Sequence, residues 1–427
     1  MKAVRIAIVG VLVLAVSFTS VWGSVITAAP AKVEFQHLRW KGNTIKIAIS
    51  NSLTRPSSNI KTDSDVMGAV ERSLKAWSRA ANIDLQAEFS ERQNVSPNGP
   101  FGDGVSLITI AQTPENVLFF AKDADSASAK TRIFFNRKGV ITEADVVLNP
   151  YQQFSTDGTF GTFDLESTLT HEIGHLLGLH HQGVLGATMA ESFAKNGTMG
   201  VVDFGPRTLA ESDISAIREL YGAPSDIGNC CGVISGRLTT AAGRPLKGLE
   251  VWAEDTQSGR VMGHADSGLE GSFHIGGLPG GDYSIYWKTK DASTGSAMGE
   301  VGKVGLDGGE NKAVNGKINL RSSDTTLQYL GLNSQLADYG LSLNVGRSYL
   351  VNLGGRNLDA DAAKITFNSS FIKVSQFPIT SQEFGEGVSG ISFMVTIDPD
   401  ITPGEYSIFV SSKNGPVSCV VGALSIE

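Results

Sequence analysis

The stretch HEIGHLLGLHH, which begins at His171 and ends at His181, contains the residue types that can hold a catalytic metal ion and the base that works beside it. On a helix, His171 and His175 are four residues apart, so their side chains rise from one face and can bind a single zinc ion. Gly178 has no Cβ and lets the chain leave the helix, so that His181 can return as a third nitrogen ligand. Three protein ligands leave the fourth tetrahedral position to water, and Glu172 is placed to take its proton once zinc has lowered the pKa of that water to about 7. The predicted chemistry is hydrolysis of an amide bond.

The ordinary alternative for a helical pair of histidines is an amphipathic helix with histidines on its solvated face. Here the longer pattern H-E-x-x-H-x-x-G-x-x-H is complete, which favours the zinc site. His180 competes with His181 as the third ligand, but the spacing favours His181 and leaves His180 as a neighbour at the rim of the site.

With these residues in place, the sequence resembles the metzincin metallopeptidases and, within them, the matrixins. Eight residues after His181 comes Met189, which resembles the Met-turn that lies beneath the zinc in that clan. The stretch RTLAESDISAIRELYG, which ends at Gly222, is similar to the closing helix of matrixin catalytic domains. The resemblance covers about Leu38 to Ala223, and we take residues 38–223 as the peptidase domain.

The resemblance implies an α+β metzincin catalytic domain in which a mixed twisted sheet supports a zinc-site helix. It also implies one catalytic Zn²⁺ ion and the activity of a zinc metalloendopeptidase. The metal ligands would be His171, His175 and His181, with Glu172 as the catalytic base and Met189 as the supporting Met-turn. The sequence does not show whether Ca²⁺ is bound as well.

The chain departs from animal matrixins at several positions. No cysteine precedes Cys230, so we do not expect latency through a propeptide cysteine that caps the zinc. His37 is the only histidine before His171, and no second, structural zinc is predicted. Where the family often has two adjacent aspartates in the closing helix, this chain has Ser212 and Asp213, which puts in doubt any role that needs the pair.

The N-terminus resembles a secretory signal peptide over residues 1–23. Lys2 and Arg5 supply its positive start, and Ile6–Val16 is its apolar core. An uncleaved membrane anchor is the alternative, but the apolar run is shorter than a membrane span requires. We therefore expect a secreted, extracellular protein with no membrane span after signal cleavage.

Length and charge narrow the classes of function. A chain of 427 residues suggests two or three domains, and 49 glycines indicate many turns and short strands. The formal net charge of −8 argues against a nucleic-acid partner, which would favour a basic surface. The expected partner is a protein or peptide substrate.

Periodicity predicts the elements that position the motif. A core helix is expected over Asp63–Ala81 with Thr62 or Asp63 as its cap, Asp164 should cap the zinc helix, and Ser212 should cap the closing helix. Tyr221 is expected to serve packing. Strands are predicted at Ile45–Ile49, Ile83–Phe89, Val105–Ile110, Val117–Ala121, Arg132–Asn136 and Ile141–Leu148.

Two all-β sandwich domains are predicted after the peptidase domain. Residues 230–320 resemble the carboxypeptidase regulatory-like, transthyretin-type family through GSFHIGGLPGGDY, and residues 324–427 are similar to immunoglobulin-like modules of the IPT/TIG type through ITPGEYSIFVSSKNG. His264 and His274 are isolated and are expected to be structural or exposed. Neither sandwich shows a cluster of candidate catalytic or metal-binding residues, so they are interpreted as spacers, docking modules or adhesion modules.

The cysteines leave two pairings open. Either Cys230 or Cys231 bonds with Cys419 and clips the linker to the last sandwich, or the two neighbours bond to each other.

Taken together, the sequence predicts a multi-domain, secreted zinc metalloendopeptidase that cleaves internal peptide bonds. The rival interpretation is a surface-binding or adhesion protein with a vestigial peptidase-like domain. Docking to a polymer or a cell surface through the two C-terminal sandwiches is compatible with either.

Overall fold

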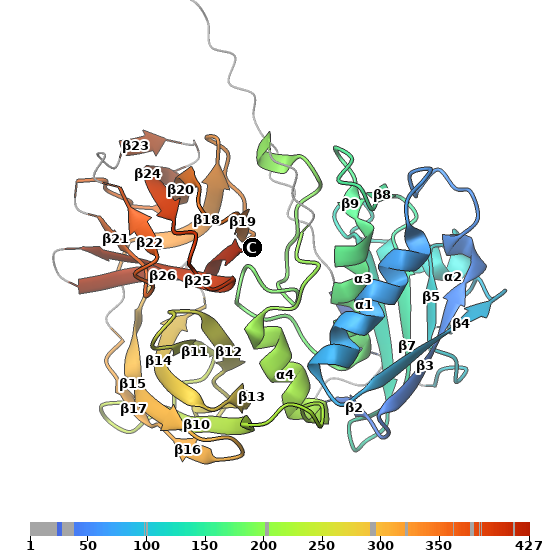
Figure 1. Cartoon of the computed structure of the whole chain (residues 1–427), viewed down its shortest axis with the longest axis horizontal. Helices are drawn as coiled ribbons and strands as arrows, with labels where there is room; N and C mark the ends of the chain where they lie inside the picture. Colours follow the sequence, from blue (N-terminus) through green and yellow to red (C-terminus); the bar gives the residue numbers. More distant parts are fainter. Residues whose placement is uncertain are drawn as a thin grey trace, which may run out of the picture.

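The structure is a computed structural model with three regions, and Figure 1 shows the first of them beside the other two. We call them the N-terminal region (residues 24–27 and 38–222), the middle β-region (residues 230–318) and the C-terminal β-region (residues 326–426). The predicted signal segment, Met1–Gly23, lies outside the described residues. The structure describes residues 24–27 and 38–427 except 98, 100, 201–204, 291–295, 321–322, 362, 376–379, 384, 386 and 413–414.

A seven-stranded sheet forms the base of the N-terminal region, with strand order β1-β6-β7-β5-β3-β4 and β2 paired with β7. Strand β6 runs antiparallel to β7, whereas the pairs β7–β5, β5–β3 and β3–β4 are parallel, so the sheet is mixed as expected. Its strands are β1 (Ser24–Thr27), β2 (Arg39–Trp40), β3 (Thr44–Ser50), β4 (Asp84–Ser90), β5 (Leu107–Thr109), β6 (Ala129–Phe135) and β7 (Val140–Leu148).

Helices α1 (Val66–Ala80) and α3 (Leu165–Leu176) lie together over one face of this sheet (Figure 1). Their apolar side chains and those of the sheet form one core. Trp77 of α1 is completely buried and donates a hydrogen bond from Nε1 to the carbonyl oxygen of Thr170 in α3, at 2.8 Å. The remaining elements of this region are α2 (Pro114–Val117), α4 (Glu211–Tyr221), the short pair β8 (Phe154–Ser155) and β9 (Phe163–Asp164), and the 3₁₀ turns η1 (Asn51–Leu53), η2 (Leu118–Phe120) and η3 (Thr198–Gly200).

The predicted strand Val117–Ala121 is wrong, because this segment is the end of α2 followed by η2. Thr113 accepts a hydrogen bond from the Asn116 amide, and Pro114 occupies the first turn, which together start a helix. The run of apolar residues after Pro114 also fits the pattern of a strand. Short apolar runs do not distinguish the two structures.

Two predicted helix caps are also corrected. Helix α1 begins after Asp65, whose Oδ1 accepts from the Gly68 amide at 3.0 Å, and not after Thr62 or Asp63. Helix α4 is capped at Ala210, and Ser212 lies inside the first turn. The predicted cap of α3 is confirmed, since Asp164 accepts from the Ser167 amide at 2.8 Å.

The middle β-region consists of two sheets around their own apolar core. One sheet has the order β13-β10-β16 with β17 also on β10, and the other has the order β12-β11-β14-β15. The strands are β10 (Cys230–Thr240), β11 (Leu249–Asp255), β12 (Val261–Asp266), β13 (Ser272–Pro279), β14 (Gly281–Thr289), β15 (Met298–Leu306), β16 (Asn311–Ala313) and β17 (Gly316–Ile318).

The C-terminal β-region is built in the same way, from two sheets and a separate core. Its sheets have the orders β18-β20-β24-β22, with β23 on β24, and β19-β26-β25-β21. The strands are β18 (Thr326–Leu332), β19 (Leu341–Leu343), β20 (Ser348–Arg356), β21 (Lys364–Thr366), β22 (Ile372–Val374), β23 (Thr380–Glu383), β24 (Ser389–Ile397), β25 (Gly404–Ser412) and β26 (Gly415–Ile426). Among the described residues of all three regions, no helix is long and apolar enough to cross a membrane.

A small apolar core joins all three regions around the loop that follows His181. We call it the shared core, and its buried members are Val184, Ala187 and Ala210 from the N-terminal region, Trp252 and Val261 from the middle β-region, and Phe409, Cys419 and Val421 from the C-terminal β-region. The backbone reinforces it, because the amides of Leu185 and Gly186 donate to the carbonyl oxygens of Val421 and Gly422 at 3.0 and 2.8 Å. The C-terminal β-region therefore fixes the loop between His181 and Met189.

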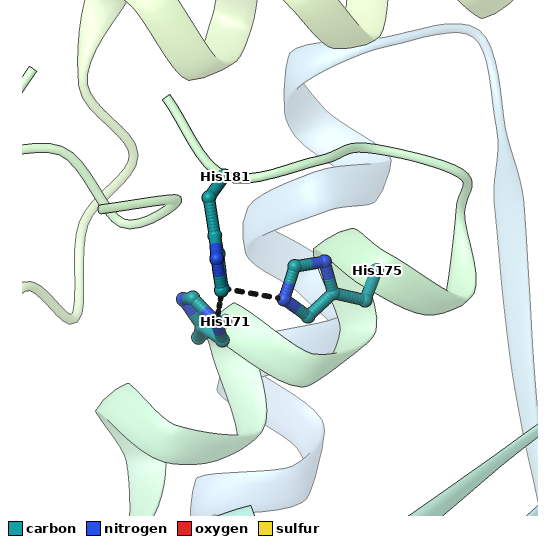
Figure 2. Close-up of side chains that lie close together, drawn as sticks. All are labelled: His171, His175 and His181. Atoms are coloured by element: carbon teal, nitrogen blue, oxygen red, sulfur yellow. Dashed lines mark hydrogen bonds between the residues drawn. The ribbon is translucent and has the colours of Figure 1, made fainter. Parts of the chain in front are cut away.

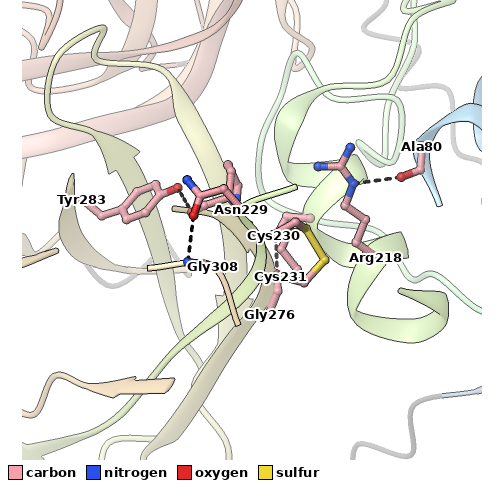
Figure 3. The surroundings of a disulfide bond; sticks show 11 residues. Ala80, Arg218, Asn229, Cys230, Cys231, Gly276, Tyr283 and Gly308 are labelled. Atoms are coloured by element: carbon pink, nitrogen blue, oxygen red, sulfur yellow. Dashed lines mark hydrogen bonds between the residues drawn. A yellow bond between two sulfur atoms is a disulfide. The ribbon is translucent and has the colours of Figure 1, made fainter. Parts of the chain in front are cut away.

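The cysteines follow the second of the two predicted pairings. Cys230 and Cys231 form a disulfide at the start of β10 (Figure 3), and Cys419 is free and buried in the shared core. Beside the disulfide, Asn229 accepts a hydrogen bond from the Gly308 amide at 3.0 Å. The bridge thus lies where the linker after α4 enters the middle β-region.

Candidate metal centre

Three histidine side chains converge at the C-terminal half of α3 (Figure 2). His171 and His175 project from the helix, and His181 reaches back from the loop that follows it. The Nε2 atom of His181 lies 3.1 Å from that of His175 and 3.3 Å from that of His171. A tetrahedral zinc with bonds of about 2.0–2.1 Å separates its nitrogen ligands by about 3.3 Å, so the spacing fits such an ion.

The backbone turn that brings His181 back depends on Gly178. Its φ is 104°, a left-handed conformation that favours glycine, and a Cβ would lie 2.1 Å from the Leu38 carbonyl oxygen. The chain therefore leaves the helix at the residue that the motif predicted, and a side chain there would collide with the segment that leads into β2.

The outer nitrogens of the two helical histidines are held by carbonyl groups. The Nδ1 atom of His171 is 2.7 Å from the Thr188 oxygen, and the Nδ1 atom of His175 is 2.9 Å from the Leu179 oxygen. A carbonyl can only accept, so each Nδ1 carries the proton and each Nε2 keeps a lone pair for a metal.

The three imidazoles are also neutral around pH 7. Burial, helped by the neighbouring histidines, lowers the pKa of His171 to about 3 and that of His181 to about 4, and it holds the pKa of His175 well below its ordinary value. Because metal binding needs deprotonated nitrogens, the environment suits the donor set.

Glu172 is fully buried next to the first histidine. Its Oε2 accepts a hydrogen bond of 2.5 Å from the Thr131 hydroxyl of β6, whereas its Oε1 has no hydrogen-bond partner in the described part of the chain. Burial raises the pKa of the carboxyl to about 8, and a zinc ion at the three histidines would lower it again, because a nearby positive charge favours the ionised carboxylate that can act as a base. A buried polar atom without a partner is uncommon, and this one is available to a water molecule beside the histidines.

Met189 lies directly under the helix that carries the ligands. A Cβ on Gly174, between the two helical histidines, would be 2.3 Å from the Met189 sulfur and 2.7 Å from a ring carbon of Trp77. Met189 is buried, as is the whole of α3. The glycine at this position permits the close approach of the methionine and the tryptophan to the helix.

Asp213 holds the turn around Met189 without a second aspartate. Its carboxylate accepts from the amides of Thr188, Met189 and Ala210, at 2.9–3.1 Å, and from the side-chain amide of Gln182 at 2.5 Å. Burial raises its pKa to about 6, so the group is ionised at neutral pH. The single carboxylate of Asp213 thus binds the Met189 turn, with Ser212 at the position of the second aspartate.

The other histidines that the structure describes, His180, His264 and His274, stay outside this group. His180 is exposed, and His274 forms an ion pair with Glu219 at 3.2 Å. Within the part of the chain that the structure describes, His171, His175 and His181 are the one group of three or more His, Cys, Asp or Glu residues close enough to share a metal ion.

Sequence reasoning missed three contacts of the site. Thr131, on Glu172, comes from a strand with no motif of its own, and Thr188, on His171, contributes only its backbone. Phe193 packs edge-on against His171, with ring centroids 4.8 Å apart. The position of Thr188 next to Met189 is the one signal that could have indicated a role.

Comparisons with known proteins find similarity to a recognised family over the segment that carries the histidines. Residues 108–222 match the family model for matrixin, Peptidase_M10. The chain is 28% identical over 202 residues to Metalloendoproteinase 1 of Glycine max, and the match covers 43% of this chain and 53% of that protein. The chain thus spans about half the length of this curated relative.

Solved structures resemble the chain only weakly. The major pilin subunit BcpA of Bacillus cereus is 12% identical, with a TM-score of 0.16, over 46% of this chain and 69% of that one. The Bacteroides ovatus protein SGBP-B, solved with a mixed-linkage heptasaccharide, is 12% identical, with a TM-score of 0.18, over 45% of this chain and 42% of that one. The matrixin match and the plant metalloendoproteinase carry more weight, and with the histidine group they support a matrixin-like, metallopeptidase domain in this chain.

Proposed function

We propose that the protein is a secreted, zinc-dependent metalloendopeptidase that hydrolyses internal peptide bonds of proteins. The observation that supports it most directly is the set of three neutral imidazoles whose Nε2 atoms lie 3.1 and 3.3 Å apart, next to a glutamate with one unpartnered oxygen. Secretion rests on the signal-like segment Met1–Gly23 alone.

His171, His175 and His181 would hold the zinc ion. When bound, zinc supplies a Lewis acid for the scissile carbonyl and lowers the pKa of the attacking water. Glu172 accepts the proton of that water at Oε1 and delivers it to the leaving amine. Thr131 holds the other carboxylate oxygen, so the side chain keeps its orientation while the proton moves.

The outer edge of β6 is where an extended substrate would pair. Thr131 of β6 contacts Glu172, and in this structure the short strand Ser24–Thr27 lies parallel on the same edge, with Val25 opposite Thr131. An extended chain can thus be accommodated along the strand that borders the candidate base. A substrate backbone would take this place by strand addition.

The test is cleavage of a mixed peptide library by the zinc-loaded protein, with products identified by mass spectrometry. The wild type should cut internal bonds, and Glu172→Ala should retain about one zinc per chain but lose several orders of magnitude in kcat/KM. His175→Ala should lose the metal itself, as measured by metal analysis. Near wild-type turnover in Glu172→Ala would overturn the proposed mechanism, and bound zinc with no cleavage by the wild type would favour the surface-binding alternative.

A further inference from the structure

A groove with a volume of about 1130 Å³ lies between the N-terminal region and the middle β-region. One side is formed by residues 178–182, after the zinc-site helix, and by one face of α4. The opposite side is formed by the ends of β12 and β13 and by the turn between them. Two regions that the sequence predicts to be separate domains thus form the groove together.

The groove borders the metal centre at His181. His181 lines it, and the Nε2 atom of the same ring lies 3.1 Å from the Nε2 atom of His175. The next residue, Gln182, also lines the groove and is held by Asp213. A polypeptide whose scissile bond lies at the three histidines can therefore continue directly into the groove.

The far wall of the groove consists of strand edges. Strands β12 and β13 are each the outermost strand of their sheet, and α4 covers only part of them, through a hydrogen bond of 2.6 Å from the Ser215 hydroxyl to the Gly276 oxygen. Residues 264–266 and 272–274 face the groove instead. Edge strands present main-chain groups to which an extended chain can bond.

The charged side chains of the wall already have partners. Arg237 pairs with Glu270 at 2.5 Å, and Asp266 pairs with a lysine, Lys290, at 2.6 Å. A charge on a ligand would therefore add little to its binding free energy in the groove. Two buried atoms, His264 Nε2 and Asp266 Oδ1, have no hydrogen-bond partner in the described chain, and a peptide backbone offers groups of both kinds.

An apolar anchor stands at the turn of this wall. Leu269, between β12 and β13, lines the groove and is 54% exposed. Covering an exposed aliphatic side chain of this size is favourable, because it removes apolar surface from water. Ala265 and Phe273 flank Leu269 on the two strands. The wall thus combines extended backbone with one uncovered apolar side chain.

We propose that this groove is a substrate-binding subsite, in which an extended segment of the substrate beyond the scissile bond lies along the β12–β13 wall and packs an apolar side chain on Leu269. The inference rests on the proposed function and extends it. It assigns the middle β-region a direct role in binding substrate, and it defines the substrate class as unfolded polypeptides that reach well past the cleaved bond.

The test compares a long substrate with a short one. Leu269→Asp should raise KM about tenfold for a denatured protein, because the covered leucine surface is lost, and should change kcat/KM less than twofold for a quenched peptide of about six residues that ends before the groove. Leu350→Asp is the matched control, since Leu350 is a 45% exposed leucine on β20 that does not line the groove. The control should match the wild type on both substrates.

A binding measurement separates the groove from catalysis. In the Glu172→Ala background, a fluorescently labelled denatured polypeptide should bind about tenfold more weakly when Leu269→Asp is added. Failure of the wild type to cleave either substrate would overturn the proposed function. The binding measurement would then show by itself whether the groove binds polypeptide. Equal binding with and without Leu269→Asp, or an equal loss on the long and the short substrate, would overturn the subsite.

Discussion

Replacing Gly174 by alanine tests how closely the zinc-site helix rests on its support. The added Cβ would lie 2.3 Å from the Met189 sulfur and 2.7 Å from Cζ2 of Trp77, and the rigid, buried indole cannot turn aside. Overpacking of this kind costs about 1–3 kcal/mol, and two contacts this short put the cost at the upper end, about 3 kcal/mol. Alanine returns about 1 kcal/mol through its higher helix propensity. The variant should therefore lose about 2 kcal/mol of unfolding free energy.

The substitution should also weaken zinc binding. Because His171 and His175 flank Gly174, a shift of the helix away from Met189 moves both ligands, and we expect zinc affinity to fall about tenfold. Urea unfolding followed by tryptophan fluorescence and zinc competition against a chelator measure the two effects. Adding Met189→Ala to Gly174→Ala should remove part of the penalty, as a double-mutant cycle would show. A Gly174→Ala protein as stable as the wild type, with unchanged zinc affinity, would refute this account of the packing.

Two further predictions concern the grip of the C-terminal β-region on the loop after His181. Burial raises the pKa of Glu405 to about 8 from an ordinary value of 4.5, so its contribution to stability is present at low pH and is lost as pH rises to about 8. The unfolding free energy of Glu405→Gln, relative to that of the wild type, should therefore rise by about 1.4 kcal/mol per pH unit between the pKa of the unfolded chain, 4.5, and the folded value of about 8. Unfolding at several pH values measures this difference. Parallel curves of unfolding free energy against pH for the two proteins would contradict the prediction. A Cβ on Gly340 would lie 2.8 Å from the backbone of Gly186, so Gly340→Ala should cost about 1–3 kcal/mol and weaken zinc binding, whereas Gly228→Ala, where a Cβ has open space, should do neither. Equal thermal shifts for the two alanine variants would contradict the contact.

Local rules in the sequence anticipated much of the zinc-site helix. Asp164 caps it, the chain leaves it at Gly178, and His181 returns to the two helical histidines, because each of these features depends on a few neighbouring residues. The closing helix ends at Gly222, and the Tyr221 hydroxyl donates to the Leu177 oxygen at 2.7 Å, in keeping with a packing role.

Contacts set by distant parts of the chain could not be predicted in this way. Thr131 reaches Glu172 only because sheet register places β6 beside α3, and no spacing in the sequence encodes that register. The segment after Thr113 forms a helix end and a 3₁₀ turn where a strand is predicted, because apolar pairs such as Phe119 and Phe120 suit a buried turn as well as a strand. The partners of Val184 lie in regions that begin tens of residues later, and only the tertiary fold brings them together.

The shared core also bears on how the molecule can be made. N-terminal segments of a chain generally fold before later ones during synthesis. A nascent chain that ends before β26 would lack Val421, so Val184 and Ala187 would remain open to water, and the amides of Leu185 and Gly186 would lack their acceptors. The loop between His181 and Met189 can therefore reach its final position only after β26 has been made. Shortened forms that lack β26 would leave this loop without its support beside the metal centre.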